Sequence, residues 1–349
     1  MRGEYKVRGG KLVIVHVDEV DGRYANAHLS GDFFLEPDEA LEQINAGING
    51  VPTSASAEEL AASIEAALDE NARLVGFDPL AVAIAARRAV GGAISWADLR
   101  FEVIGPEVMD PAMHVALDEV FPAELAAGRR GPVLRFWDWD SPLVVIGSFQ
   151  SVRNEIDAEN AAAYGIRVVR RITGGGAMFM EPGNCITYSL TVPGSLVEGL
   201  SYEQSYAYLD DWVLGALEEV GVHASYKPLN DIASDKGKIG GAAQRRLVGG
   251  TVLHHVTMSY DIDADKMMQV LRIGREKLSD KGTRSANKRV DPMRSQTGLP
   301  REEIFRRFMA YFMNRYDAAE SGYRPEEIAQ ARRLLDEKFT TNEWTYRVP

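Results

Sequence analysis

The stretch IRVVRRITGGGAMFMEPGNCITYSLTVP, residues 166–193, places a glycine cluster between two apolar segments that are typical of strands. The first segment ends in Arg170 and Arg171, and residues 174–176 are all glycine. Glycines let a backbone approach a ligand closely and aim amide N–H groups at it. Arg171 can pair with a carboxylate or phosphate as a bidentate fork. A turn beside a solvated arginine pair is the alternative, because a glycine run alone is a weak signal.

A second glycine-rich stretch, NDIASDKGKIGGAAQRR, covers residues 230–246. Lys238 opens a predicted strand in this stretch, and the neighbouring glycines leave room for a ligand around its ammonium. A point charge there would stabilise a phosphate or a developing carbonyl oxygen. Asp231 offers a carboxylate for Mg²⁺. A hairpin with a surface lysine is the alternative, since most lysines are exposed.

The remaining pattern predicts an α+β fold in two parts, residues 1–92 and residues 93–349. In the first part, Asp21-Gly22 is a hairpin-type turn between strands. In the second, a hairpin around Gly249-Gly250 joins predicted strands on either side. Hairpins, rather than strict strand–helix–strand order, favour α+β. Helices are predicted near residues 37–48, 56–69, 79–90, 111–125, 201–221, 300–316 and 324–338. The chain has no G-x-G-x-x-G that opens a helix and no Walker A pattern, so any use of ATP needs another type of site.

Composition excludes several classes of protein. The net charge of −12 argues against a general nucleic-acid binder, and no segment is long and apolar enough to span a bilayer, so a cytoplasmic location is expected.

The single cysteine, Cys185, cannot form an internal disulfide, and its apolar surroundings predict a structural role. His254 and His255 would point to opposite faces of a strand and could not share a metal. The basic stretch at residues 275–290 is either a loop that closes over a phosphate or a solvated loop.

These motifs, in this order, resemble the lipoate–protein ligase family of the biotin/lipoate ligase superfamily. RRITGGGAMFMEPGN is similar to the family's arginine pair, three glycines and Gly-Asn pair. NDIASDKGKIGGAAQRR resembles its Asn-Asp motif and lysine strand, and LHHVTMSYDID resembles its strand with paired histidines. Residues 275–290 resemble its adenylate-covering loop. The likeness extends over residues 95–349.

The N-terminal part has a resemblance of its own. KVRGGKLVIVHVDEVDGRYANAHLSGDFFLEP, residues 6–37, is similar to the small accessory domain that many of these ligases carry after the catalytic domain. In this chain it comes first. The resemblance implies a small α+β accessory domain at residues 1–92 and a catalytic domain with a large mixed or antiparallel sheet at residues 93–349.

The resemblance also implies the chemistry. Such an enzyme activates lipoate with ATP and Mg²⁺ as lipoyl-AMP and passes the lipoyl group to a lysine of a carrier protein. The implied carrier is a lipoyl domain of a 2-oxoacid dehydrogenase, the glycine-cleavage carrier or a dedicated lipoate-binding protein, with no nucleic acid or membrane as partner. Lys238 would be the catalytic residue and Asp231 the Mg²⁺ ligand. The implied substrate- and ATP-binding residues are Arg171, Gly174, Gly175, Gly176, Ala177, Asn184, Asn230, Asp231, Gly241, Ala242, His255 and Thr257.

Three alternatives stay open. An octanoyltransferase of the same superfamily uses a cysteine nucleophile and no ATP, but residues 221–237 and 251–274, where that cysteine is expected, contain none. A biotin ligase is expected to alternate arginine and glycine in the cluster, which this chain does not. A non-catalytic carrier-binding protein derived from a ligase is the third. It gains weight from Met180-Glu181 and Val256, which stand where the family usually has His-Asp and Gly.

Overall fold

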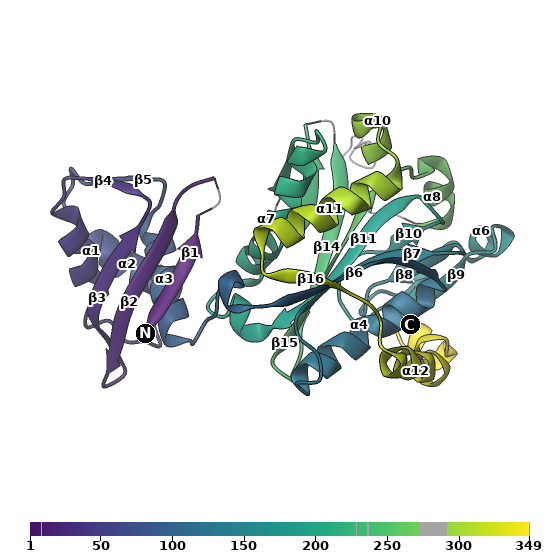
Figure 1. Ribbon diagram of the computed structural model, residues 1–349, viewed down its shortest axis with the longest axis horizontal. Helices are drawn as coiled ribbons and strands as arrows, with labels where there is room; N and C mark the ends of the chain where they lie inside the picture. Colours follow the sequence, from purple (N-terminus) through teal and green to yellow (C-terminus); the bar gives the residue numbers. More distant parts are fainter. Residues whose placement is uncertain (8, 228, 236, 273–291, 349) are drawn as a thin grey trace. The chain divides into compact units, whose positions relative to one another are not determined.

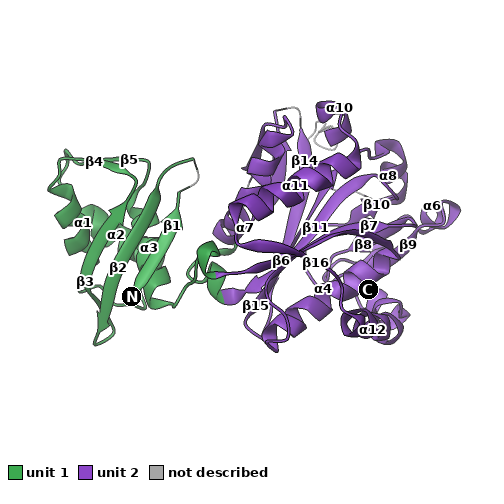
Figure 2. Ribbon diagram, viewed as in Figure 1, with its two compact units in different colours: residues 1–98, 195–202 green, residues 99–194, 203–349 purple. Residues whose placement is uncertain are grey.

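The computed structural model describes residues 1–348 except residues 8, 228, 236 and 273–291 (Figure 1). The chain divides into two compact units. The first comprises residues 1–98 and 195–202, and the second comprises residues 99–194 and 203–349 (Figure 2). The basic stretch at 275–290, predicted to cover an adenylate, lies wholly outside the described residues.

The first unit is an antiparallel sheet, in the order β1-β2-β3, with three helices and a small strand pair. Asp21 and Gly22 form the β2–β3 turn at φ values of 53° and 71°, where the predicted hairpin turn was placed. The helix predicted near residues 56–69 begins with a capping box, in which Ser56 and Glu59 bond reciprocally. The elements are β1 (Arg2–Lys6), β2 (Leu12–Val20), β3 (Arg23–Gly31), β4 (Phe34–Glu36), α1 (Ala40–Ile48), α2 (Ala57–Ala67), β5 (Arg73–Val75), α3 (Pro79–Val90) and η1 (Trp96–Asp98).

Arg88 of α3 ties a later segment of the chain into the first unit. Its side chain is only 1% exposed. The guanidinium donates to the carbonyl oxygens of Glu198 at 2.8 Å and Leu196 at 3.2 Å, and also to those of Glu4 at 2.8 Å and Ile94 at 3.0 Å. A buried arginine needs acceptors of this kind for its donors. Residues 195–202 are therefore part of this unit although more than ninety residues separate them from its other segment.

The second unit is built on an eight-stranded sheet in the order β12-β13-β14-β15-β11-β7-β6-β16 (Figure 1). Among the described strands of this sheet, the parallel pairs are those of β6 with β7 on one side and with β16 on the other. A smaller sheet has the order β10-β8-β9. The strands are β6 (Phe101–Met109), β7 (Val133–Trp139), β8 (Leu143–Ile146), β9 (Arg167–Arg170), β10 (Met178–Met180), β11 (Cys185–Pro193), β12 (Ala224–Lys227), β13 (Asp231–Ser234), β14 (Lys238–Arg246), β15 (Thr251–Ser259) and β16 (Ala318–Ser321).

Helices cover both faces of the large sheet. α4 packs against β7, β11 and β15 on one face. α7 and α11 cover the other face, where Trp212 of α7 contacts Tyr188 of β11 and Phe312 of α11 with ring centroids 4.9 and 5.1 Å apart. The helical segments of this unit are α4 (Pro111–Ala126), α5 (Val152–Glu155), α6 (Ala158–Ala163), α7 (Tyr202–Glu219), α8 (Ala264–Val270), α10 (Met293–Thr297), α11 (Arg301–Arg315), α12 (Pro325–Leu334), η3 (Leu335–Phe339) and α13 (Asn342–Thr345), and η2 (Gly194–Val197) leads into the segment that belongs to the first unit.

The architecture confirms the predicted α+β class with a large mixed sheet. The hairpin around Gly249-Gly250 is present as β14 and β15, and β14 begins at Lys238 as predicted. The turn after β7 leads the chain out of the large sheet, because β8 pairs with β9 and β10 instead. Several short strands were not predicted, namely β1, β5, β10, β12, β13 and β16. Within the described residues no helix combines the length and the apolar composition needed to cross a membrane.

Candidate active site

The three-glycine turn lies over β14 of the large sheet. Gly175 adopts φ +91°, a conformation that side chains rarely tolerate, and a methyl group there would lie 3.8 Å from Cβ of Ala243. Gly147, in the turn after β8, is just as constrained, because a methyl group on it would come within 2.1 Å of the Gly175 carbonyl oxygen. Ser148 N donates to Thr173 O at 2.8 Å and joins the two turns. The glycines thus permit two backbone turns to pack together above β14.

Arg171 turns inward and holds this turn. Its Nη2 donates to the carbonyl oxygens of Gly174 at 2.6 Å and Gly176 at 2.8 Å, and its Nε donates to Oγ1 of Thr173 at 2.9 Å. The residue is 3% exposed, and burial lowers the pKa of its guanidinium to about 10. Arg171 was expected to bind a carboxylate or phosphate directly. In this structure it instead donates hydrogen bonds to the backbone of the glycine turn.

Lys238 and Asp231 form an ion pair on the same face of the sheet. Lys238 Nζ lies 2.7 Å from Oδ1 of Asp231, and the two side chains are 47% and 39% exposed. Gly241 makes room for them, since a methyl group on Gly241 would lie 3.5 Å from Nζ and 3.7 Å from Oδ1. Gly241 and Ala243 are two residues apart on one face of β14, a spacing of about 7 Å. The ammonium and the glycine turn therefore flank the same short stretch of this strand.

The other predicted site residues have different surroundings. Asn230 Nδ2 donates to Ala242 O at 2.7 Å and so fastens its loop to β14. The Ala242 side chain is on the opposite face from Gly241, because neighbours in a strand alternate. Thr257 Oγ1 lies 3.0 Å from Oγ1 of Thr187 in the interior of the sheet. Asn184 holds the turn before β11, where its Oδ1 accepts from the backbone N of Glu181 at 2.9 Å. Thr257 pairs with Gly241, so its side chain is on the face of Gly241 and Lys238.

His255 stands at the centre of a buried hydrogen-bond network below the glycine turn. Its Nδ1 lies 2.7 Å from Oδ2 of Asp118 in α4, and its Nε2 lies 2.7 Å from Oγ1 of Thr173. Asp118 Oδ1 accepts from Arg135 Nη2 at 2.5 Å and from Ser189 Oγ at 2.6 Å. Burial alone would raise the pKa of the Asp118 carboxyl, but Arg135, His255 and Ser189 hold it below its usual value. Burial lowers the pKa of His255 in spite of the carboxylate. Asp118 is thus ionised and His255 neutral at pH 7.

The network continues to His114 on α4. Its Nε2 lies 2.6 Å from the carbonyl oxygen of Asp138 and must donate to it, so its Nδ1 accepts from Arg135 Nη1 at 3.0 Å. Burial and then Arg135 lower the pKa of His114 to about 3. Asp118, His114 and Arg135 were not predicted as site residues. One signal was available, because His114 and Asp118 are four residues apart, on one side of the predicted helix.

The paired histidines of β15 face opposite ways, as strand alternation predicts. His254 Nε2 lies 2.6 Å from Oδ1 of Asp210 in α7, which covers the far face of the sheet. His255 faces Asp118 of α4 on the near face. Two adjacent imidazoles are therefore anchored by carboxylates from helices on opposite sides. Among the described residues no cluster of three or more His, Cys, Asp or Glu side chains could hold a metal ion.

Cys185 and two residues that depart from the ligase pattern, Met180 and Val256, are in the interior. Glu181, the third departure, is only partly buried. Cys185 is 0% exposed, and burial raises the pKa of its thiol to about 12. Met180 is also 0% exposed and packs in the same apolar core as α4. Val256 is 1% exposed and pairs with Ala242, so it lies on the face away from Lys238. None of the three buried residues presents a side chain at the surface beside the glycine turn.

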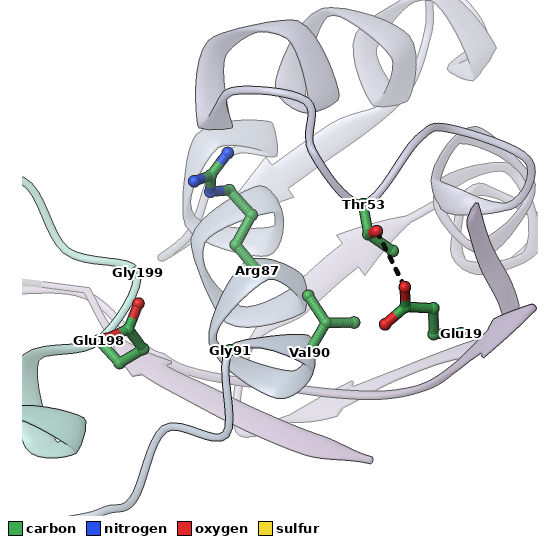
Figure 3. A pocket seen from close by; sticks show the side chains of 7 residues that line it. All are labelled: Glu19, Thr53, Arg87, Val90, Gly91, Glu198 and Gly199. Atoms are coloured by element: carbon green, nitrogen blue, oxygen red, sulfur yellow. Dashed lines mark hydrogen bonds between the residues drawn. The ribbon is translucent and has the colours of Figure 1, made fainter. Parts of the chain in front are cut away.

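A cavity of about 260 Å³ opens in the first unit (Figure 3). Three of its polar side chains already have partners, since Thr53 Oγ1 bonds Glu19 at 3.3 Å and Arg87 donates to the carbonyl oxygen of Ala55. None of the predicted site residues contributes to its walls. The cavity is lined by Glu19, Thr53, Arg87, Val90, Gly91, Glu198 and Gly199.

Comparison with known proteins yields relatives of two activities. Octanoyltransferase LipM of Halalkalibacterium halodurans is 25% identical over 266 residues, which cover 68% of this chain and 95% of the relative. Lipoate-protein ligase A subunit 1 of Thermoplasma acidophilum is 28% identical over 245 residues, covering 66% of this chain and 90% of the relative. Sequence similarity alone therefore leaves ligase and transferase unresolved.

Solved structures share the fold. The bi-partite lipoate protein ligase of Thermoplasma acidophilum, solved in a study of that ligase and its E2 lipoyl domain, matches with a TM-score of 0.63 and 26% identity, covering 72% of this chain and 98% of that one. A lipoate-protein ligase A bound with ATP matches with a TM-score of 0.62 and 23% identity, covering 72% of this chain and 100% of that one. The family model of the lipoyl protein ligase A/B catalytic domain matches residues 110–313, more than half of the chain. The protein therefore belongs to the lipoyl protein ligase A/B catalytic domain family.

Proposed function

We propose that the protein is an ATP-dependent lipoate–protein ligase, in which residues 93–349 form the catalytic domain and residues 1–92 an accessory domain. The observation that carries the proposal is the position of Lys238. Its ammonium projects from the start of β14, over Gly241, on the sheet face where the glycine turn lies. A mobile cation beside a backbone turn rich in glycine suits a substrate that brings several negative charges together.

In the first reaction the lipoate carboxylate attacks the α-phosphorus of ATP. A carboxylate O–P bond forms, the bond between the α-phosphorus and the bridging oxygen breaks, and pyrophosphate leaves. The main barrier is the approach of two anions, so positive charge at Lys238 and amide N–H groups of the glycine turn would lower it. Mg²⁺ favours oxygen ligands and keeps waters and phosphates around it, so the single Asp231 carboxylate fits as its protein ligand, and the ion would neutralise phosphate charge.

In the second reaction the amine of a carrier lysine attacks the acyl carbonyl of lipoyl-AMP. An amide bond forms, the C–O bond to AMP breaks, and the amine gives up a proton. The carbonyl oxygen gains negative charge on the way, and Lys238 would stabilise it. The proposed acceptor is a lipoyl carrier domain, because the Thermoplasma acidophilum ligase of similar fold was studied with its E2 lipoyl domain.

The buried thiol favours a ligase over a transferase. Transfer without ATP passes the acyl group through a nucleophile, and a cysteine must be accessible and thiolate-like to serve. The only cysteine of this chain is 0% exposed, and burial raises its pKa to about 12. Activation by ATP removes the need for such a nucleophile.

The test is an assay of pyrophosphate release by the full chain with ATP, Mg²⁺ and lipoate, followed by mass spectrometry of candidate carriers. Release that requires both ATP and lipoate, with a lipoyl group added to one carrier lysine, is the expected result. A second arm offers an octanoylated carrier as donor and omits ATP. Transfer in that arm, lost in Cys185→Ala, would establish the transferase instead. Binding of lipoate without pyrophosphate release would point to a non-catalytic carrier-binding protein.

A further inference from the structure

A continuous line of hydrogen bonds joins helix α4 to the glycine turn. It runs from Asp118 to His255 at 2.7 Å and from His255 to Thr173 at 2.7 Å. Arg171 Nε then donates to the Thr173 hydroxyl at 2.9 Å. Each of these four residues is at most 4% exposed. The line therefore lies in the interior, where a misplaced proton or a lost partner is costly.

The direction of each hydrogen bond follows from the partners. Asp118 is ionised and can only accept, so His255 carries its proton on Nδ1. The lone pair on Nε2 must then accept the Thr173 hydroxyl proton. This leaves the Thr173 oxygen free to accept from Arg171 Nε, which can only donate. One arrangement of protons satisfies every group, and the carboxylate of Asp118 sets it.

The far end of the line determines how the glycine turn presents its backbone. Arg171 Nη2 binds the carbonyl oxygens of Gly174 and Gly176, which therefore point inward. In a trans peptide the N–H of the next residue points the opposite way. The amides of Gly175 and Ala177 consequently point away from Arg171, and neither donates a hydrogen bond to any of the described residues. Paired outward amides of this kind are an anion-binding device.

We propose that Asp118 is a positioning residue that acts through His255, Thr173 and Arg171 to aim the Gly175 and Ala177 amides at the anionic groups of the substrate. The identity of that anion, the lipoate carboxylate or the α-phosphate, rests on the proposed function. The positioning itself is a property of the apoprotein. Ser189 and Arg135 assist by holding the Asp118 carboxylate in place.

The first test is Asp118→Asn. An asparagine that keeps its carbonyl toward Arg135 and Ser189 presents its NH₂ group to His255, which forces the proton from Nδ1 to Nε2. We expect ¹⁵N-histidine NMR to report this change of tautomer, and the rate of lipoyl-AMP formation to fall on the order of 100-fold through misplacement of the turn. Retention of the Nδ1–H tautomer, or of full activity, would overturn the proposal.

Thr173 supplies a matched pair of variants. Thr173→Val removes the hydroxyl and keeps the shape, so it should lose activity as Asp118→Asn does. Thr173→Ser keeps the hydroxyl and should stay close to the unsubstituted enzyme. Because both residues act along one line, Asp118→Asn combined with Thr173→Val should be little worse than either change alone. Additive losses, or equal losses in Thr173→Ser and Thr173→Val, would show independent structural roles.

Asp210→Asn is the control for general destabilisation. Asp210 is 0% exposed and pairs with His254 at 2.6 Å, but from the other face of β15. The Asp210→Asn variant should lose about as much stability as Asp118→Asn. It should keep the normal rate of adenylate formation per folded molecule. If the unsubstituted chain forms no adenylate at all, the proposed function fails. The tautomer of His255 and the affinity for lipoate measured by calorimetry would still decide the role of Asp118.

Discussion

Nζ of Lys238 and Oδ1 of Asp231 lie 2.7 Å apart, so the cation proposed for catalysis and the carboxylate proposed for Mg²⁺ form an ion pair. Both side chains are more than one-third exposed. Such a pair contributes less than about 1 kcal/mol to stability. Under the proposed function, ATP would therefore separate the pair at little cost.

Lys238→Ala should abolish most adenylate formation without unfolding the protein. Removing one preorganised charge from a transition state costs on the order of 100-fold or more in rate. Loss of an exposed ion pair should leave the unfolding free energy nearly unchanged. Pyrophosphate release and thermal unfolding, measured on the same preparation, check both parts. Lys238→Arg keeps the charge and should retain more activity than Lys238→Ala; equal activity in all three forms would contradict a catalytic role.

Gly147→Ala should disturb the glycine turn. The added methyl group would come within 2.1 Å of the Gly175 carbonyl oxygen, which is a backbone atom that cannot rotate away. The two turns must then separate, with a loss of stability of about 1–3 kcal/mol and of lipoate affinity. Gly174→Ala is the control, because its methyl group would make only ordinary contact with Phe149 at 3.7 Å. Denaturant unfolding and lipoate titration distinguish the two variants.

Cys185→Ala should leave the catalytic rate largely intact. The thiol packs in the core, so its removal costs about 1 kcal/mol of stability through a small cavity. Burial raises the pKa of this thiol to about 12, so the native protein should resist thiol reagents at pH 8 and react only when unfolded. Reaction of the folded chain with a chromogenic disulfide, or complete loss of acyl transfer in the variant, would argue for a thioester route.

Stability should fall as the pH drops below about 6.5. His114 has a pKa of about 3 when folded, whereas an unfolded histidine titrates near 6.5, so between these values the unfolded state binds more protons. The loss is about 1.4 kcal/mol per pH unit for this residue and levels off near pH 3. His255, whose pKa is also lowered by burial, adds a loss of the same sign. Denaturant unfolding between pH 8 and 4 measures the slope, and His114→Gln should reduce it. A stability that is constant or rises on acidification would contradict the assignment of neutral histidines.

The parts of the fold that the sequence predicts are those with local signals. Asp78 and Pro79 begin α3 as an N-cap and first-turn proline should, and Gly249-Gly250 turns the β14–β15 hairpin. β16 has no such signal. Its four residues, AAES, are mostly exposed and form a strand because they pair in parallel with β6, more than two hundred residues away. Pairing of this kind is decided by the folded chain and leaves little trace in a short segment.

The site shows the same division. The glycine turn and Lys238 are recognisable as motifs, and the structure places them over one stretch of β14. The polar network cannot be recognised as a sequence motif, because Asp118, Arg135 and His255 come from a helix and two different strands. Arg171 illustrates a further limit: a sequence shows that a bidentate donor is present but not which acceptor it meets, and here the acceptors are carbonyl oxygens of its own turn.

The hydrogen bonds of Arg88 to the segment at residues 195–202 limit where the chain can be cut to give a stable fragment. Cleaving it after residue 98 would remove the acceptors at Glu198 and Leu196 and leave a guanidinium that is 1% exposed with orphaned donors. An unsatisfied buried donor costs about 1–3 kcal/mol, which is a large share of the free energy of unfolding of a small domain. A fragment ending at residue 98 should therefore have a lowered free energy of unfolding. Addition of a peptide spanning residues 195–202 should raise it again.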